Sequence, residues 1–510
     1  MKKKIALLLS IIMVVSVFAA CGNKTNNNSS TAVVDGDFGG LEIPIKNNGE
    51  EIKWVCITDT AATNDLYAQK RLAEVTGVNI KFEVNPSSGW KQKLNVLLAG
   101  RELPDIIGQL AMMTSAQLND YGKQGAFAEV TQHLDIMPNF SKFLKENDTY
   151  IKSYGNLEGK LYGFPRFNIG NQFEHGVSYR KDIMDKHGLK MWTNKEEFYQ
   201  TLKKIKELYP KMVPLTNKYG TFFFYHIANQ WAYCNNDVYF DEESKTWKFS
   251  NTEEGYRDML DYLKKLYSEG LLDPEFATRT SADFSSILSR GEAFAALDII
   301  GRDDILNEQS SIEGYEMEMG APIGPAGTMS VANVTIPAIA VANNKNQEIS
   351  MQLMDFLYSP YGIQLMSIGE EGVTYNKTDK EDIITFIDCE ESQANIEVKY
   401  GLMIQGSFVS LDSRTPINRY SEGNQKIIDE IYSKKYVELN PVIPFTDEEG
   451  KKVSEIRAKL ENPGYEFSFK YVIGQASTDK DWENWKKEAE RLGSKELVKI
   501  HNDAYKRFIK

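Results

Sequence analysis

Apolar and polar residues recur with two different periods near the start of the chain. Residues 52–57 form an apolar run that favours a strand, and residues 78–84 place an apolar side chain at every second position, which predicts a strand with one covered face. Segments 66–77 and 90–100 carry apolar residues at helical spacing, and both end at a glycine. A third strand is expected over residues 103–107. Strands that alternate with helices predict parallel pairing and an α/β fold.

Further elements follow along the chain. Residues 193–196 read Thr-Asn-Lys-Glu before an apolar helical stripe, which predicts a capping box at a helix start. Residues 238–249 hold two short aromatic runs around a polar turn and predict a hairpin, and residues 294–300 predict a buried strand. Trp482 and Trp485 lie at helical spacing on an amphipathic segment. We therefore interpret these two rings as packing residues.

The N-terminal segment has the layout of a secretory signal peptide. Three lysines at positions 2–4 precede an uncharged apolar stretch over residues 5–17, too short to predict a transmembrane span. Residues 18–21 read Phe-Ala-Ala-Cys and resemble the lipobox of bacterial lipoproteins, so we expect residues 1–20 to be removed and Cys21 to carry lipid. An ordinary signal peptide with an incidental cysteine is the alternative. Residues 21–49 begin Asn/Ser/Thr-rich and are expected to form a flexible tether.

Composition and charge narrow the class of protein. The chain has 510 residues, of which 42% are hydrophobic and 26% charged, as in ordinary globular proteins. Its net charge of −13 and the lack of a basic stripe argue against nucleic acid. Besides Cys21, only Cys56, Cys234 and Cys389 occur, which is not the pattern of a disulfide framework. Their redox state stays open, with at most one bridge.

Five stretches, in order along the chain, resemble motifs of one family. They are Gly-Lys-Leu-Tyr-Gly-Phe-Pro at 159–165, Tyr-Arg-Lys-Asp-Ile-Met at 179–184, Leu-Tyr-Ser-Glu-Gly-Leu-Leu-Asp-Pro-Glu-Phe at 266–276, Gly-Glu-Glu-Gly-Val-Thr-Tyr at 369–375 and Tyr-Val-Ile-Gly-Gln-Ala-Ser at 471–477. Each is weak alone, but the ordered set is similar to extracellular solute-binding proteins of sugar importers (family 1, lipoprotein type). Some members carry an Asp/Asn-rich calcium loop. Residues 208–215 lack the necessary carboxylates, so we expect no metal here.

The resemblance implies a two-lobe α/β fold of the periplasmic-binding-protein-like class, class II type, with a hinge and a central ligand cleft. The first lobe is expected to comprise residues 50–164 plus about 332–395, and the second residues 165–331 plus about 396–510. Crossings between the lobes are expected near 164–166, 331–335 and 390–400. Ligands of such open sheets lie beyond the carboxyl ends of the strands.

Candidate ligand-binding residues follow from these strand ends, crossings and turns. Sugars present hydroxyl groups and apolar C–H faces, which suit polar side chains and aromatic rings respectively. The predicted set is Asp59, Arg166, Asn168, Tyr179, Arg180, Trp231, Asp298, Arg302, Glu371 and Tyr375. Trp231 is equally compatible with a stacking platform and with a core position. Arg180 could instead form a salt bridge between lobes, and Glu371 could merely cap a turn.

Catalytic motifs are missing from the sequence. Neither HExxH nor GxSxG occurs, and acidic pairs such as Glu370-Glu371 do not by themselves place two carboxyl groups across a glycosidic bond. We therefore expect a binding protein with no catalytic residue and no cofactor. A binder of a non-sugar solute, a sensor subunit and a surface glycosidase are the alternatives.

We expect the protein to be a monomer. Its expected partners are a carbohydrate ligand and the permease subunits of an ABC importer, which are separate chains. Arg166, Arg180 and Arg302 suit a uronate, but arginine also binds neutral hydroxyls, so both classes of sugar stay open. The expected location is extracytoplasmic, with attachment to the cell membrane through the lipid on Cys21.

Overall fold

The computed structural model describes residues 35–510 except 88, 101, 109, 111–112, 169–172, 174, 219, 235–236, 330–333, 381, 390–392 and 416–420. Cys21 and the predicted signal peptide therefore lie outside the described residues. Among those that are described, no helix combines the length and the apolar character needed to cross a bilayer.

The first sheet confirms the strands predicted near the N-terminus. Its order is β2 (Asn79–Asn85), β1 (Glu51–Ile57), β3 (Ile106–Gly108), β12 (Val334–Val341) and β4 (Phe164–Phe167). β1 pairs in parallel with β2 and β3, as the alternation with helices predicts, whereas β12 runs antiparallel to β3 and β4. This sheet therefore joins an N-terminal α/β unit to strands from the middle of the chain.

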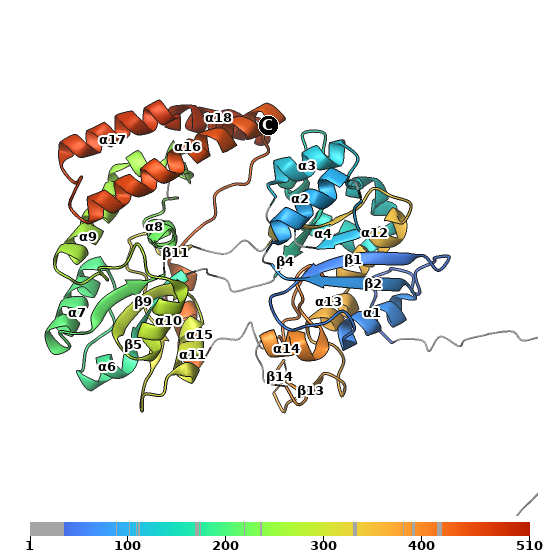
Figure 1. The fold of residues 1–510 in the computed structure, drawn as a ribbon, viewed down its shortest axis with the longest axis horizontal. Coiled ribbons are helices and arrows are strands. Elements are labelled where there is room, and N and C mark those ends of the chain that lie inside the picture. The colour runs from blue at the N-terminus through green and yellow to red at the C-terminus, as the bar shows by residue number, and fades with distance from the viewer. Residues whose placement is uncertain are drawn as a thin grey trace, which may run out of the picture. The chain divides into compact units, whose positions relative to one another are not determined.

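Helices accompany the first sheet (Figure 1). They are α1 (Tyr67–Thr76), α2 (Trp90–Gly100), α3 (Ser115–Lys123), η1 (Val130–Ile136), α4 (Pro138–Glu146), α5 (Tyr150–Tyr154), α12 (Gln347–Leu357), α13 (Pro360–Ser367) and α14 (Gln393–Tyr400). α1 ends as predicted at Gly77, whose φ of 69° is left-handed and favours glycine. Trp90, Leu94 and Leu98 of α2 are buried in the core of this sheet.

The second sheet has the order β10 (Met317–Met319), β5 (His175–Arg180), β9 (Ala293–Ile299) and β6 (Val213–Asn217). β9 is the predicted buried strand, and six of its seven residues are buried. β6 runs parallel to β9, whereas β5 runs antiparallel to it. This difference in direction decides which strand ends meet at one edge.

A larger set of elements belongs with the second sheet. The helices are α6 (Lys181–Lys186), α7 (Lys195–Leu208), α8 (Gly220–Asn229), η2 (Ser250–Thr252), α9 (Glu254–Ser268), α10 (Ser281–Ser289), α11 (Arg302–Gln309), α15 (Glu422–Glu430), η4 (Tyr432–Lys434), α16 (Asp447–Val472), α17 (Asp479–Leu492) and α18 (Ser494–Phe508). The pair β7 (Val238–Asp241) and β8 (Thr246–Phe249) confirms the predicted hairpin. A further small pair is β11 (Thr328–Met329) with β15 (Tyr436–Val437). The pair β13 (Tyr375–Lys377) and β14 (Ile384–Phe386) instead lies beside α14, where the Phe386 and Tyr400 rings are 6.1 Å apart between centroids (Figure 1).

The C-terminal helices complete the core of the second sheet. α16, α17 and α18 lie side by side, and α16 contacts α9 (Figure 1). Trp482 and Trp485 are 1% and 5% exposed, and both indoles donate hydrogen bonds inside the protein, to Glu254 and to the Asn251 carbonyl. The interpretation of these rings as packing residues is confirmed.

Contacts with the first sheet continue past the predicted third crossing. Gln405 bridges to Ile57 of β1, and the Val409 carbonyl accepts a hydrogen bond of 2.8 Å from the Phe167 N–H of β4. These contacts favour a boundary later than residue 395. Part of the second predicted crossing, at residues 331–333, lies outside the described residues, and the division into lobes stays a prediction.

Candidate functional site

The carboxyl edge of the second sheet gathers polar side chains from three strands. Because β6 and β9 are parallel, Lys218 after β6 and Asp298 near the end of β9 reach the same edge. β5 runs the other way, so its first residue, His175, pairs with Ile299 at that edge. The ends of parallel strands are where open α/β sheets bind ligands.

Asp298 is the centre of this edge. Its side chain is 2% exposed and forms an ion pair with the Lys218 ammonium, and Arg302 Nε lies 3.4 Å from its second oxygen. The Ile299 N–H donates to the carboxylate at 2.7 Å. A buried carboxylate needs such partners because desolvation disfavours an isolated charge. Arg302 is about a third exposed and begins α11, so it lies at the boundary with solvent.

Two histidines stack beside this carboxylate. The rings of His175 and His226 lie 3.3 Å apart between centroids and are 25° from parallel. Burial, together with the charge of Lys218, lowers the pKa of His175 to about 2 and that of His226 to about 3, so both imidazoles are neutral at physiological pH. Tyr225 stands perpendicular to His226, with 4.8 Å between centroids.

An acidic cluster follows at the start of α11. The Asn424 amide of α15 donates to Asp303 at 2.8 Å and to Asp304 at 3.2 Å. Asp303 is fully buried. Burial and, to a smaller extent, the neighbouring Asp304 raise the pKa of Asp303 to about 7. These contacts tie α15 to the helix that carries Arg302.

The corresponding edge of the first sheet holds a second polar group. Thr58 and Thr60, just after β1, donate from their hydroxyls to the buried Glu397 of α14 at 2.5 and 3.2 Å. Asp59 is exposed and accepts hydrogen bonds from the Ser87 N–H and hydroxyl, which lower the pKa of Asp59. Asp59 therefore fixes the loop after β2 in the described structure.

The predicted ligand residues divide into several groups. Asp298 and Arg302 lie together at the carboxyl edge. Tyr179 and Arg180 do not, because they end a strand that runs antiparallel, so they lie at the opposite edge. Arg180 pairs with Asp182 at 2.6 Å and lies 4.3 Å over the Tyr315 ring, and the Tyr179 hydroxyl donates to Glu318 at 3.0 Å. No salt bridge between lobes is needed to explain Arg180.

Trp231 is placed in the core rather than at a surface. Its side chain is 5% exposed, and its indole N–H donates to Asp258 at 3.0 Å. The ring packs near Tyr262, with 5.9 Å between centroids. Of the two readings that the sequence allowed, the structure favours packing, because a ring with so little exposed surface offers no face to a ligand.

The remaining candidates are scattered. Glu371 is exposed and pairs with Lys377 at 2.6 Å, and Tyr375 is buried beneath Arg414, whose guanidinium lies 5.7 Å from its ring. Arg166 is half-buried over the Phe408 ring at 5.7 Å, and burial lowers its pKa. Asn168 is exposed with a φ of 48°. Arg166 thus lies in β4 of the first sheet and Asn168 directly follows it, whereas Glu371 belongs to a surface turn.

The sequence pattern did not identify His175, Lys218 and His226. One signal was present for Lys218, which directly follows the apolar-polar run of residues 213–217. His175 is the first residue of β5, and only a known strand direction places it at the carboxyl edge. Within the described residues, no group of three His, Cys, Asp or Glu side chains is arranged to hold a metal ion.

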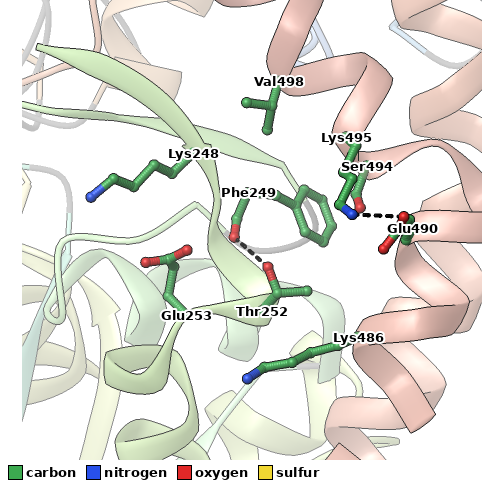
Figure 2. Close-up of a pocket in the computed structure, with 9 residues that line it drawn as sticks. All are labelled: Lys248, Phe249, Thr252, Glu253, Lys486, Glu490, Ser494, Lys495 and Val498. Atoms are coloured by element: carbon green, nitrogen blue, oxygen red, sulfur yellow. Dashed lines mark hydrogen bonds and ion pairs between the residues drawn. The ribbon is translucent and has the colours of Figure 1, made fainter. Parts of the chain in front are cut away.

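A cavity of about 440 Å³ lies away from this edge, between β8, η2, α17 and α18 (Figure 2). Its three lysines already have carboxylate partners: Lys248 pairs with Asp241, Lys486 with Glu254 at 3.0 Å, and Lys495 with Glu490 at 2.7 Å. The one ring that lines it, Phe249, is 4% exposed. This cavity therefore lacks the aromatic face and uncommitted charge of a sugar site.

Comparisons with solved structures show the fold. The structure of the alginate-binding protein AlgQ2 without calcium ion has a TM-score of 0.72 at 21% identity, covering 90% of this chain and 99% of that one. An extracellular solute-binding protein from Bifidobacterium longum subsp. infantis has a TM-score of 0.73 at 17% identity, covering 91% and 99%. The chain thus has the two-lobe α/β fold of periplasmic-binding-protein-like proteins.

Sequence comparisons point the same way. The fructooligosaccharide ABC transporter substrate-binding protein FusA of Streptococcus pneumoniae is 23% identical, over 97% of this chain and 96% of the relative. The polygalacturonan/rhamnogalacturonan-binding protein YtcQ of Bacillus subtilis is 23% identical, over 89% and 91%. The family model described as bacterial extracellular solute-binding protein matches residues 68–378. Since this match spans more than half of the chain, the protein belongs to the family of bacterial extracellular solute-binding proteins.

Proposed function

We propose that this protein captures a carbohydrate, an oligosaccharide, and delivers it to the permease of an ABC importer. The observation that carries the proposal is Arg302, about a third exposed at the carboxyl edge of the second sheet and held by the buried Asp298, which also pairs with Lys218. A guanidinium group donates hydrogen bonds to sugar hydroxyls, and its orientation depends on the carboxylate behind it. Relatives named for fructooligosaccharide and rhamnogalacturonan binding support the class of ligand.

The first lobe would supply the other side of the site. Its carboxyl edge offers Arg166 near the end of β4, Asn168 after β4, and Asp59 and Thr60 after β1. We propose that a hinge joins the lobes and that the ligand occupies a cleft between them. The carboxylate of Glu397 holds Thr58 and Thr60 and would fix the loop after β1 for this purpose.

One variant tests the proposed site. Asp298→Asn keeps the shape of the side chain but removes the charge between two cations, so we expect affinity for the cognate glycan to fall at least about tenfold. Glu371→Gln is the matched control, because Glu371 is an exposed carboxylate that pairs with Lys377. Calorimetric titration of both variants measures the effect. Equal affinity of Asp298→Asn and the wild type would remove Asp298 from the site, and a loss in Glu371→Gln would point to the Gly-rich turn instead.

A glycan panel tests the function as a whole. Kestose, diacetylchitobiose, digalacturonic acid and maltotriose would be incubated with the wild-type protein, and melting temperature and product formation would be scored together. Binding without turnover is the expected result. Cleavage of a glycan would identify a surface glycosidase, and stabilisation by a non-sugar solute alone would identify the other alternative class.

We also propose that the mature protein is a monomer anchored by lipid on Cys21. The apolar stretch and the Ala-Ala-Cys sequence support this proposal, and acyl chains contribute about 0.8 kcal/mol of membrane affinity per buried methylene. Cys21→Ala should release folded protein from the membrane fraction. Retention of this variant in the membrane would contradict the anchor.

A further inference from the structure

Tyr225 is an unusual aromatic side chain in this structure. Its ring is 41% exposed, whereas most tyrosines and all described tryptophans are partly or fully buried. It lies on α8, the helix that follows Lys218, and therefore near the carboxyl edge of the second sheet. Among the described residues, Tyr436 is the other exposed aromatic ring, at 44%.

The ring of Tyr225 is the outermost of a series of three aromatic rings. His226 meets it at 88°, with 4.8 Å between centroids, and His226 in turn stacks on His175 at 3.3 Å. His226 is 6% exposed and His175 belongs to β5, so the base of this series is anchored in the sheet. A ring fixed in this way loses little conformational freedom when a ligand stacks on it.

The groups around the ring suit a ligand that combines polar groups with an apolar face. Lys218 lies close enough to both imidazoles for its charge to act on them, and it pairs with Asp298, which Arg302 also contacts. Arg302, about a third exposed, is the member of this group that reaches solvent, and the exposed Tyr225 lies on the helix that follows Lys218. Pyranose and furanose rings combine hydroxyl groups with C–H faces and fit both parts.

We propose that Tyr225 is the stacking residue for one sugar ring of the ligand and that His226 and His175 are positioning residues that fix its orientation. The proposal rests on the proposed function. It assigns to Tyr225 the role that the sequence suggested for Trp231, whose ring is buried.

The test compares two substitutions at one position. Tyr225→Ala removes the ring, and we expect its affinity for whichever panel glycan binds the wild type to fall roughly 10- to 100-fold. Tyr225→Phe keeps the ring and should bind within about threefold of the wild type, because stacking does not need the hydroxyl. A loss in both variants would assign the effect to the hydroxyl rather than to stacking.

A matched control exists in the same lobe. Tyr209 also contacts a histidine, with 2.9 Å between its hydroxyl and His187 Nε2, but it precedes β6 and so belongs to the opposite edge of the sheet. Tyr209→Ala should leave affinity unchanged at temperatures where it is folded. If Tyr225→Ala binds as tightly as the wild type, the inference fails while the proposed function stands. If no panel glycan binds the wild type, the proposed function fails first.

Histidine NMR tests the positioning part without any ligand. Lys218 at the end of β6, Asp298 on β9 and Arg302 of α11 are the charged groups around the stacked imidazoles. With both rings buried against each other, the His175 and His226 signals should not titrate between pH 5 and 8, whereas an exposed histidine should. Titration of both signals in that range would overturn the stack and the positioning roles with it.

Discussion

The indole of Trp231 donates to Asp258 and packs among buried rings, so its contribution is to stability. Replacing a buried tryptophan by alanine removes packing contacts and leaves a cavity, which costs about 3–5 kcal/mol of unfolding free energy. We expect Trp231→Ala to lose stability of this order and Trp231→Phe to lose less. Urea denaturation measures both. Unchanged stability of Trp231→Ala would show that the ring is not a core residue.

Asp303 gives the protein a specific pH dependence. Its folded pKa of about 7 lies above its ordinary value, so the folded state keeps a proton that the unfolded chain releases near pH 4. Stability from this group is therefore greatest at low pH and is lost as the pH rises from about 4 to about 7. In that window the unfolding free energy falls by about 1 kcal/mol for each pH unit.

Asp303→Asn should remove this contribution to the pH dependence of the unfolding free energy. The charged neighbours are Asp304 and Glu318, and Asn424 donates to both aspartates. We expect the unfolding free energy of the variant minus that of the wild type to be more positive at pH 8 than at pH 5. Denaturation at several pH values, with Glu371→Gln as an exposed control, measures the difference. Parallel curves for Asp303→Asn and the wild type would contradict the buried, protonated carboxyl.

The sequence could predict some residues of the site and not others, for a physical reason. Asp298 and Arg302 follow a strongly apolar run, so their position near a strand end is local information. Tyr179 and Arg180 also end a strand, but their edge depends on the direction of β5 relative to β9, which local pattern does not contain. For the same reason, the sequence pattern did not indicate that His175 lies at the carboxyl edge.

At the scale of elements, the start of α7 lies one residue later than the sequence pattern predicts. Asn194 is the N-cap, and its side-chain oxygen accepts from the N–H groups of Glu196 and Glu197, each at 3.0 Å. Thr193 instead donates its N–H and hydroxyl to the Glu197 carboxylate at 2.8 and 2.9 Å. The predicted box at 193–196 was therefore wrong by one position, because Asn and Thr both suit a cap and periodicity does not choose between them.

This arrangement makes a prediction about two neighbouring residues. Asn194→Ala leaves two N–H groups of α7 without their cap and should cost about 1 kcal/mol of unfolding free energy. Asn194→Asp, which keeps an acceptor oxygen, should cost much less. Thr193→Ala should also cost less than Asn194→Ala because its contacts are exposed. A larger loss in Thr193→Ala, measured by urea denaturation, would restore the predicted register.

Periodicity was most informative where one face of an element is buried throughout. The first three strands of the first sheet, β1 to β3, the buried strand β9 and the hairpin of β7 and β8 were all predicted in the correct type. β12 pairs antiparallel beside β3, however, and joins residues more than two hundred positions apart. Such pairings depend on long-range packing, so residue pattern alone does not specify them.

At the scale of the molecule, ordered motifs carried more information than composition. The resemblance of the five stretches between residues 159 and 477 predicted the family that the match over 68–378 shows, and with it the fold. The limits of the lobes were harder to predict from the sequence. Contacts of residues 397–409 with β1 and β4 favour a limit of the first lobe later than the predicted 395, and the division into lobes stays a prediction.

Polar groups at the carboxyl edges of two separate sheets lead to a prediction about conformational change. A ligand that contacts both Arg302 in one lobe and Thr60 or Arg166 in the other would bind the closed arrangement more tightly than the open one. Such a difference in affinity shifts the population toward the closed form, whereas equal affinity would shift nothing. We therefore expect a saturating cognate glycan to reduce the radius of gyration measured by small-angle scattering. Asp298→Asn, at a glycan concentration it does not bind, should keep the radius of the unliganded protein. If the wild-type radius is unchanged when calorimetry shows full occupancy, the ligand engages one lobe alone and the hinge plays no part in capture.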